Sequence, residues 1–319
     1  MKLYSRILGT GSYLPKKILT NKDIEEIVDT TDEWIFDRTG IRQRHVVVEG
    51  ETCSDLAVAA ARAAMEAAGV DPSEIDLIVL ATTTPDQIFP STACIIQPRL
   101  GIRGVPAFDI QAVCAGFVYA LSVADQFIRT GSAKRALVIG ADTMSRLLDW
   151  QDRSTCILFA DGAGAVVLGA AEEPGIISTH ISADGAYKDL LQVPKGIGRG
   201  GCEDPYLEMR GNEVFRWAVS TLGRIVDETL EANGMTKSDI DWLVPHQANI
   251  RIIQATARRL VLPMEQVVVT VADHGNTSAA SIPLALDTAV RDGRIQRGQT
   301  ILMEGFGGGF TWGTVLARF

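Results

Sequence analysis

The 319-residue chain carries a net charge of −9 and has a pI near 5.0, and 46% of its residues are hydrophobic. This composition is typical of a globular protein with a large core, and its acidity argues against a dedicated nucleic-acid-binding protein or a basic membrane-surface protein. Because the N-terminus lacks the apolar core of a signal peptide and no run of about 18 uncharged apolar residues occurs, we expect a cytoplasmic protein that does not cross a membrane.

Helix and strand patterns alternate along the chain. The first half contains an alanine-rich helix predicted over 54–68 and a helix predicted over 115–130 that is apolar on nearly every face, which indicates an interior position. The other elements predicted in this half are strands at 76–82, 136–140 and 164–169. The second half repeats this order, with elements predicted at 213–232, 241–245, 278–290, 300–303 and 312–319. Such alternation predicts an α/β fold built in layers, and 195–204, rich in glycine and charge, predicts a surface loop.

An internal repeat indicates that the chain is a duplication. Residues 66–79 resemble residues 231–244, an offset of 165 positions. The same offset aligns further pairs, namely Leu137 with Leu302, Gly140 with Gly305, Ala115 with Ala280, Ala120 with Ala285 and Leu121 with Leu286. A period of this length indicates a duplicated domain, with halves predicted at 1–170 and 171–319.

Cys114 is the first candidate for chemistry, because it lies at the predicted start of the apolar helix. Free amides and the helix dipole at such a position stabilise a thiolate, which is the nucleophilic form of cysteine. The alternative, that Cys114 is a small core residue, stays open on this residue alone. The five cysteines form no Cys-x-x-Cys pair and no cluster with histidine, so we expect neither a metal site nor a disulfide framework.

His246 and Asn276 are the next candidates. His246 directly follows the predicted strand at 241–245, and Asn276 precedes the repeat counterpart of the Cys114 helix. Loops at strand ends are where α/β folds carry their chemistry, and a pseudo-twofold axis would bring both loops to Cys114. An equally open alternative is that both residues only cap turns or helices. The glycine run at 305–309 lacks the Gly-Lys-Ser/Thr of a phosphate-binding loop, and no complete dinucleotide fingerprint occurs.

Four motifs together resemble β-ketoacyl-acyl carrier protein synthase III, the family that starts bacterial type II fatty-acid synthesis. They are Ala-Val-Cys-Ala-Gly-Phe at 112–117, Pro-His-Gln-Ala-Asn at 245–249, Gly-Asn-Thr-Ser-Ala-Ala-Ser at 275–281 and Gly-Phe-Gly-Gly-Gly-Phe-Thr-Trp-Gly at 305–313. The resemblance runs in order along the whole chain. It implies a thiolase-like α/β fold with five layers, α-β-α-β-α, made of two duplicated halves, and a homodimer.

The resemblance also implies a reaction and roles for residues. A short acyl-CoA, expected to be acetyl-CoA, condenses with malonyl-acyl carrier protein to give a 3-oxoacyl-acyl carrier protein, CoA and carbon dioxide. Cys114 corresponds to the acylated nucleophile, His246 and Asn276 to the pair that receives the malonyl thioester oxygen, and the amides of Cys114 and Gly308 to the oxyanion hole. Two donors suit the enolate that decarboxylation creates. No cofactor is implied, because CoA enters only as part of the substrate.

Further positions match the family's binding sites. Trp34, Arg38 and Arg153 correspond to the residues that hold the adenine of CoA, and Phe89 to the residue that closes the acyl pocket across the dimer. The pantetheine tunnel corresponds to Met209, Gly211, Phe215, Ala248 and Asn249.

A site for the acidic acyl carrier protein is suggested by the residues themselves. Residues 249–260 predict an amphipathic helix that places Arg251 and Arg258 on its polar face, with Arg259 beside them. The alternative is that these arginines are simply solvated.

Related condensing enzymes differ at single residues. A degradative thiolase would carry a second cysteine near 305–309, and an elongating synthase would carry histidine in place of Asn276. A synthase III-like acyltransferase or condensing enzyme of a secondary-metabolite pathway, making a quinolone or polyketide, remains the alternative. The intact set of Cys114, His246 and Asn276 argues against a catalytically silent subunit.

Overall fold

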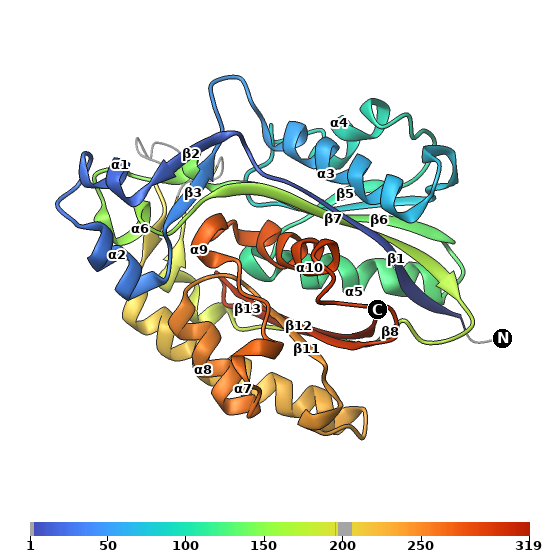
Figure 1. Ribbon diagram of the computed structural model, residues 1–319. Helices are drawn as coiled ribbons and strands as arrows, with labels where there is room; N and C mark the ends of the chain where they lie inside the picture. Colours follow the sequence, from blue (N-terminus) through green and yellow to red (C-terminus); the bar gives the residue numbers. More distant parts are fainter. Residues whose placement is uncertain (1–2, 195, 197–205) are drawn as a thin grey trace.

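Two β-sheets stacked between helices form the framework of the protein (Figure 1). The computed structural model describes residues 3–194, 196 and 206–319, so the predicted loop at 195–204 lies outside the described residues except for Gly196. Within the described residues, no helix is long and apolar enough to span a bilayer.

The first sheet has the strand order β1-β7-β6-β4-β5, in which β4 runs parallel to β5 and β6, and β7 runs antiparallel to β1 and β6. Its strands are β1 (Tyr4–Tyr13), β4 (Leu77–Ala81), β5 (Ala107–Ile110), β6 (Arg135–Thr143) and β7 (Asp161–Ala171). The second sheet has the order β11-β12-β13-β8, with only β11 and β12 parallel. Its strands are β8 (Ile176–Ala183), β11 (Trp242–Pro245), β12 (Thr300–Gly307) and β13 (Thr311–Arg318).

Helices cover both sheets and fill the space between them. The outer face of the first sheet carries α3 (Cys53–Ala68) and α4 (Thr92–Arg99), and that of the second carries α7 (Gly211–Ala232) and α8 (Ile250–Leu260). The central layer consists of α5 (Gly116–Arg129) and α10 (Ser281–Arg291). This order confirms the expected five layers, α-β-α-β-α (Figure 1).

The remaining elements are short. The paired strands are β2 (Lys17–Thr20) with β3 (Gln43–Val46), and β9 (Leu191–Gln192) with β10 (Glu208–Met209). The short helices are α1 (Asn21–Glu25), α2 (Asp32–Thr39), α6 (Arg153–Cys156) and α9 (Val271–His274).

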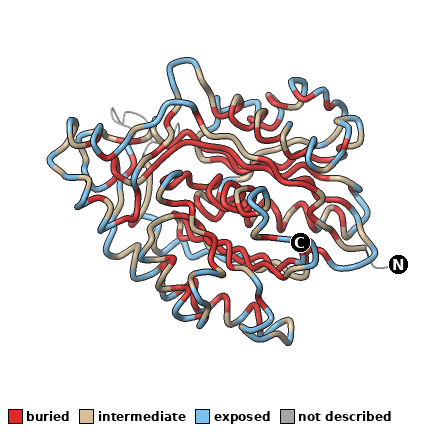
Figure 2. The backbone as a smooth tube through the Cα atoms, in the orientation of Figure 1, coloured by how far each residue is buried: buried red, intermediate tan, exposed pale blue. Residues whose placement is uncertain are grey.

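The apolar sequence of α5 explains its central position. Phe117, Leu121 and Ile128 are fully buried, in one cluster with Val79 of β4 and Met303 of β12. A helix that is apolar on every side has no face for solvent, so it is stable only between two apolar sheets. Each large apolar side chain buried in this way stabilises the fold by roughly 1.5–3 kcal/mol. Figure 2 shows both sheets and the helices between them as mostly buried.

The offset of 165 residues recurs in the elements themselves. It separates the first residues of β4 and β11, of β6 and β12, of α5 and α10, and of the tight turns η2 (Val113–Ala115) and η8 (Ser278–Ala280). Val113 and Ser278 open these turns, and both have a positive φ, of 48° and 50°. The corresponding parts of the chain therefore share local geometry as well as sequence.

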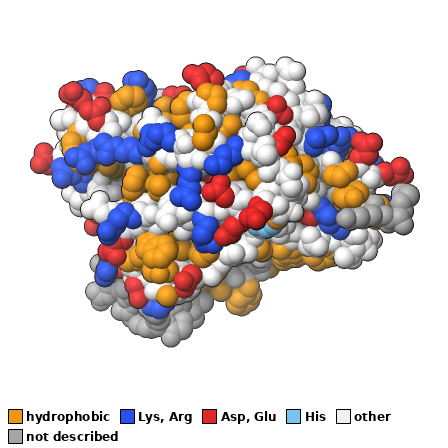
Figure 3. Space-filling model, turned by 90° about the horizontal axis from the view of Figure 1, so that it is seen from below, with side chains coloured by type: hydrophobic (Ala, Val, Ile, Leu, Met, Phe, Trp, Pro, Cys, Tyr) orange, Lys and Arg blue, Asp and Glu red, His pale blue; other side chains and the backbone are white. Residues whose placement is uncertain are grey.

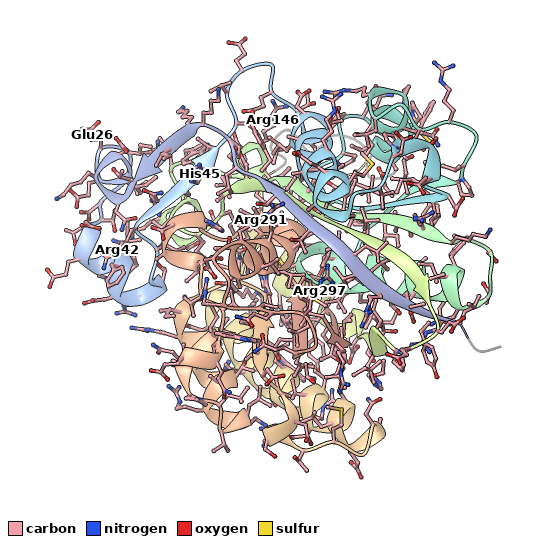
Figure 4. The ribbon with its side chains drawn as sticks, turned by 45° about the vertical axis from the view of Figure 1, so that its right-hand side comes forward. Glu26, Arg42, His45, Arg146, Arg291 and Arg297 are labelled. Atoms are coloured by element: carbon pink, nitrogen blue, oxygen red, sulfur yellow. The ribbon has the colours of Figure 1, made fainter. Side chains whose placement is uncertain are left out.

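Arginines of the second half bind the free edge of the first sheet. Arg291 donates to the carbonyl of Thr10 at 3.0 Å, and Arg297 donates to the carbonyls of Ile7 and Leu8 at 2.5 and 2.6 Å. An edge strand presents unpaired backbone groups, and these guanidinium groups satisfy part of the edge of β1. Figure 4 labels Arg291 and Arg297 close to this strand.

Candidate active site

Cys114 lies in the turn η2, which leads directly into α5. The φ of 48° at Val113 falls in the left-handed region, which non-glycine residues rarely adopt and which is frequent at functional sites. β12 passes closely: a Cβ atom on Gly307 would lie 2.6 Å from the backbone nitrogen of Cys114. Only glycine fits at position 307, and its lack of a side chain lets β12 pack directly against the backbone of the turn η2.

Burial outweighs the amide of Cys114 at the helix start, which lowers the pKa of the Cys114 thiol as expected. Burial raises the pKa of the Cys114 thiol to about 12; the Ser278 hydroxyl lowers this pKa, and the Asp142 carboxyl raises it. Desolvation prevails because the side chain is only 3% exposed, and a thiolate there would lose most of its hydration. Cys114 is therefore a neutral thiol near pH 7 and needs a proton acceptor when it reacts.

His246 follows β11, and its backbone nitrogen bonds to the Glu304 carbonyl at 2.8 Å. Its Nδ1 lies 2.5 Å from Oγ of Ser281, the first residue of α10. Burial lowers the pKa of His246 to about 3, so the imidazole is neutral. Its Nε2 has no hydrogen-bond partner among the described residues. Because a hydroxyl both donates and accepts, Ser281 satisfies Nδ1 in either tautomer, and Nε2 can donate or accept.

Asn276 is fixed through its backbone and its side-chain oxygen. Its backbone nitrogen bonds to the Leu158 carbonyl, and its own carbonyl accepts from the Ala160 nitrogen, both at 2.9 Å. Its Oδ1 accepts from the Ser278 nitrogen at 3.0 Å. No hydrogen bond involves Nδ2 in the described part of the chain, so this amide donor is available to a ligand.

A pocket of about 440 Å³ brings Cys114, His246 and Asn276 together, although they come from separate segments of both halves. A duplicated fold places equivalent loops around its pseudo-twofold axis, which is how residues so distant in sequence meet. A second pocket, of about 370 Å³, adjoins it and shares Leu191; its apolar lining includes Val113, Met144 and Leu207. The site therefore combines a thiol, a neutral imidazole and an amide in one pocket, with a second cavity beside it.

The residues predicted to hold CoA lie toward the outer part of the larger pocket. Trp34, 36% exposed, has the guanidinium carbons of Arg38 and Arg153 at 5.5 and 4.8 Å from its ring centroid. Arg153 does not line the pocket, and its Nη1 donates to the Asp29 carbonyl at 2.6 Å. The residues predicted to form the pantetheine tunnel all line the pocket: Met209, Gly211, Phe215, Ala248 and Asn249.

Five of the predicted residues line neither pocket, namely Arg153, Arg258, Arg259, Gly308 and Phe89. Gly308 directly follows β12, and a Cβ atom on it would lie 2.8 Å from the Leu191 carbonyl and 3.6 Å from the Val113 side chain. It therefore adjoins the Cys114 turn. Phe89 is 82% exposed and its neighbour Ile88 is 71% exposed, so both present an apolar surface to the outside.

The three arginines predicted to bind a carrier protein have different surroundings on α8. Arg251 lines the mouth of the larger pocket, and its Nη2 donates to the Asp37 carbonyl at 3.1 Å. Arg258 is exposed, whereas Arg259 pairs with Asp227 of α7 at 3.7 Å. Figure 3, the view from below, shows a band of Lys and Arg side chains on this side of the molecule. Positive charge is therefore concentrated locally on an acidic protein.

Sequence reasoning did not identify Ser278 and Ser281 as parts of the site. Ser278 Oγ lies 3.7 Å from the Cys114 sulfur, and Ser281 Oγ contacts His246. Ser278 opens the turn before α10 and Ser281 is the first residue of α10, positions where serine is common, so no local signal distinguished them. Their roles depend on contacts with residues more than 30 positions away.

Comparisons with known proteins agree with this geometry. The family described as 3-oxoacyl-[acyl-carrier-protein] synthase III matches residues 108–185, and the description of its C-terminal part matches residues 230–319. The β-ketoacyl-[acyl-carrier-protein] synthase III of Thiobacillus denitrificans is 67% identical over 317 residues, covering 99% of either chain.

Solved structures extend the likeness to the whole fold. The 3-oxoacyl-[acyl-carrier-protein] synthase III of Aquifex aeolicus is 49% identical with a TM-score of 0.94, covering 99% of this chain and 100% of that one. The priming β-ketosynthase of the R1128 polyketide biosynthetic pathway is 41% identical with a TM-score of 0.95, covering 100% of this chain and 97% of that one. The chain therefore belongs to the β-ketoacyl-[acyl-carrier-protein] synthase III family.

Proposed function

We propose that this protein catalyses the initiating condensation of fatty-acid synthesis. A short acyl-CoA, foremost acetyl-CoA, reacts with malonyl-acyl carrier protein to give a 3-oxoacyl-acyl carrier protein, CoA and carbon dioxide. The observation that carries the proposal is the convergence of Cys114, His246 and Asn276 on one pocket in a member of this family.

The first half-reaction transfers the acyl group to Cys114. The thiol attacks the acyl-CoA carbonyl, a new thioester forms at Cys114, and CoA leaves as a thiol after receiving the proton that Cys114 loses. Because the pKa of the Cys114 thiol is about 12, a base must accept that proton during the attack. His246 Nε2 is the available acceptor, and amides at Cys114 and Gly308 stabilise the tetrahedral oxyanion.

The second half-reaction decarboxylates the malonyl group. Carbon dioxide leaves, and negative charge moves to the thioester oxygen of the enolate, whose carbon then attacks the acyl-Cys114 carbonyl. The new carbon–carbon bond replaces the carbon–sulfur bond to Cys114, and the released sulfur takes up a proton to become a thiol again. His246 in its Nε2–H tautomer and the Asn276 amide donate to this oxygen. A neutral imidazole suits this role, because its lowered pKa keeps it from capturing a proton from solution.

The outer part of the pocket offers the groups that would bind CoA. The Trp34 ring and the guanidinium groups of Arg38 and Arg153 offer flat faces on which adenine can stack. The pantetheine arm then extends along Phe215 and Met209 toward Cys114. The direction of the pocket, from a charged rim to a buried thiol, supports an acyl-CoA as the first substrate.

Mass spectrometry of the intact protein tests the proposed function. After incubation with a panel of acyl-CoAs, the mass should rise by one acyl group for short primers, and malonyl-acyl carrier protein should then discharge that group as a 3-oxoacyl product. A mass that stays unchanged with every acyl-CoA would contradict the proposal.

The likeness to the R1128 priming β-ketosynthase keeps a second function in view, namely priming of a polyketide or another secondary metabolite. The two functions share the acylation of Cys114 and differ in the carrier protein that delivers the malonyl group. Curated relatives at 63–67% identity bear the name β-ketoacyl-[acyl-carrier-protein] synthase III, which favours fatty-acid synthesis. Competition between fatty-acid and polyketide carrier proteins for the acylated enzyme separates the two.

A homodimer is part of the proposal, supported by the exposed apolar pair Ile88 and Phe89. In a dimer, Phe89 would enter the second pocket of the partner and limit its length. We therefore expect acetyl-CoA to acylate the protein faster than octanoyl-CoA, because extra methylenes would overpack a pocket closed by a ring.

Phe89→Ala should shift this preference toward longer primers, and rates of acyl transfer from the two CoA esters measure it. The exposed apolar Val261, at the end of α8, provides a control in Val261→Ala. Faster acylation by octanoyl-CoA in the unmodified protein would contradict the prediction.

Docking of the acidic acyl carrier protein is proposed for the basic face of α8. Arg251→Glu should raise KM for malonyl-acyl carrier protein on the order of tenfold, because a like charge then faces the acidic partner. Acylation by acetyl-CoA should change little. Arg103→Glu makes the same charge change at an exposed site that lines neither active-site pocket, and it should leave KM unchanged. Equal losses in both half-reactions of Arg251→Glu would indicate damage to the CoA site instead.

A further inference from the structure

The carboxyl group of Asp142, at the end of β6, lies fully buried among donors from several segments. Its Oδ1 accepts from the Thr83 nitrogen at 2.8 Å and from the hydroxyls of Thr82 and Thr84 at 3.1 Å each. Its Oδ2 accepts from the Ala279 nitrogen at 3.0 Å. A group surrounded by donors is best satisfied as a carboxylate, because a carboxylate only accepts hydrogen bonds.

These contacts join the two halves directly behind the nucleophile. Ala279 belongs to the turn η8, in which Ser278 is its neighbour. Burial raises the pKa of the Asp142 carboxyl above its usual value, while the Thr83 and Ala279 amides and the Ser278 hydroxyl oppose this by favouring the ionised form. On its other side, Ser278 Oγ lies 3.7 Å from the Cys114 sulfur. Ser278 adopts a φ of 50°, a strained conformation that persists only when its surroundings hold it.

We propose that Asp142 and Ser278 act together as positioning residues for Cys114. The carboxylate holds the turn η8 through the Ala279 amide, and the Ser278 hydroxyl on this turn fixes the sulfur in the pocket. This inference rests on the proposed function of Cys114 as nucleophile. It gives a reason for a carboxyl group at a fully buried position between the halves, where an uncompensated charge is costly.

Among the described residues, the other titratable groups near the unit formed by Asp142 and Ser278 include His246, Cys53 and Asp161. Burial, with the Asp142 carboxyl as a smaller cause, raises the pKa of Asp161 to about 6. His246 lines the same pocket as Cys114. Cys53 of α3 faces the unit from behind, with its thiol 3.3 Å from the Ala141 carbonyl and 3.5 Å from the Thr82 hydroxyl. Burial raises the pKa of the Cys53 thiol well above its usual value, so it contributes no charge at neutral pH.

The two positioning residues should affect the Cys114 thiol in opposite directions. Asp142→Asn removes a negative charge that disfavours the thiolate, so the thiol pKa should fall. Ser278→Ala removes a hydroxyl that favours the thiolate, so the pKa should rise. A change of one unit alters the thiolate fraction at pH 8 about tenfold, so the rate of alkylation reports it sensitively.

The experiment measures the rate of Cys114 alkylation by iodoacetamide against pH in the full-length protein. We expect Asp142→Asn to react faster than the unmodified protein below the thiol pKa and Ser278→Ala to react more slowly. Asp287→Asn is the matched control, since Asp287 is also a buried carboxyl bonded to two hydroxyls, those of Thr10 and Ser12, but belongs to another part of the fold. Its alkylation profile should not change.

The alkylation profile needs no substrate, so its outcome is independent of whether the proposed condensation occurs. Ser278→Gly is a second variant that removes the hydroxyl while suiting a φ of 50°, and it should slow alkylation as Ser278→Ala does. If Asp142→Asn does not fold, the two Ser278 variants decide. Unchanged alkylation in the Ser278 variants, or a rise in reactivity for them, would overturn the proposal.

Discussion

Replacing Cys114 with alanine should abolish acylation by acetyl-CoA and formation of the 3-oxoacyl product. Decarboxylation of malonyl-acyl carrier protein should continue at a measurable rate, because the proposed donors to the malonyl oxygen, His246 and Asn276, remain in the pocket. The nucleophile and the decarboxylating pair therefore separate into two measurable activities. Intact-protein mass reports the first, and release of labelled carbon dioxide reports the second.

Cys156→Ala is the control for this prediction. Cys156 is also fully buried, and burial raises the pKa of its thiol to about 11, but it does not line the pocket. Both half-reactions should persist in this variant. Acylation of Cys114→Ala at the level of the unmodified protein would place the nucleophile elsewhere.

The layered fold was predictable because its strongest signal is local. α5 is apolar on nearly every face, and the repeat at 165 residues marked an equivalent helix, α10, in the second half. Together they predicted two similar α/β halves with a helix buried in the interior, whereas the five layers were implied by the family resemblance. The pattern needed no knowledge of tertiary contacts, since a fully apolar helix has no stable place except between apolar surfaces.

β1 shows why other elements were not predicted. Ser5 and Thr10 of this strand are buried polar residues, so the strand lacks a plain alternation of apolar and polar positions. Their hydroxyls donate at 2.6 Å to Asp125 and Asp287, which lie 120 and 277 positions away in the sequence. A buried polar group is acceptable only with such a partner, and the partner is invisible in the local sequence.

The site divides in the same way. Motifs identified Cys114, His246 and Asn276, and the structure places all three at one pocket. The electrostatic state of Cys114 was mispredicted because helix position is local, whereas burial is a property of the assembled fold. Part of that fold is the close approach of Gly307 of β12, in the other half of the chain, to the backbone of the Cys114 turn.

Replacing His246 or Asn276 with alanine should remove decarboxylation and condensation far more than acylation. Loss of one donor to a developing oxyanion costs about 10²–10³ in rate. His246→Ala should also acylate more slowly, because the Cys114 thiol, with a pKa of about 12, loses its proton acceptor. Asn276→Ala should keep its acylation rate. The double variant should lose less than the sum of the two, because both donors act on one oxygen.

The pH dependence provides a separate check on His246. An exposed histidine becomes charged as pH falls through about 6.5, but the lowered pKa of about 3 keeps His246 neutral. A histidine that titrated in this range would change the rate of decarboxylation by about tenfold per pH unit on one side of its pKa. The unmodified protein should therefore show no such change in rate between pH 5.5 and 8. The experiment follows carbon dioxide release across this range.

The decisive comparison is labelled acetyl transfer against labelled carbon dioxide release in His246→Ala and Asn276→Ala. His180→Ala serves as the control, because His180 lies on β8 and does not line the pocket. Both activities should persist in the control. Asn276→Ala should retain acetyl transfer, His246→Ala should show a slower but measurable acetyl transfer, and both variants should lose carbon dioxide release. If His246→Ala instead abolished acetyl transfer and spared decarboxylation, the imidazole would serve only Cys114, and Asn276 would have to stabilise the enolate oxygen without it.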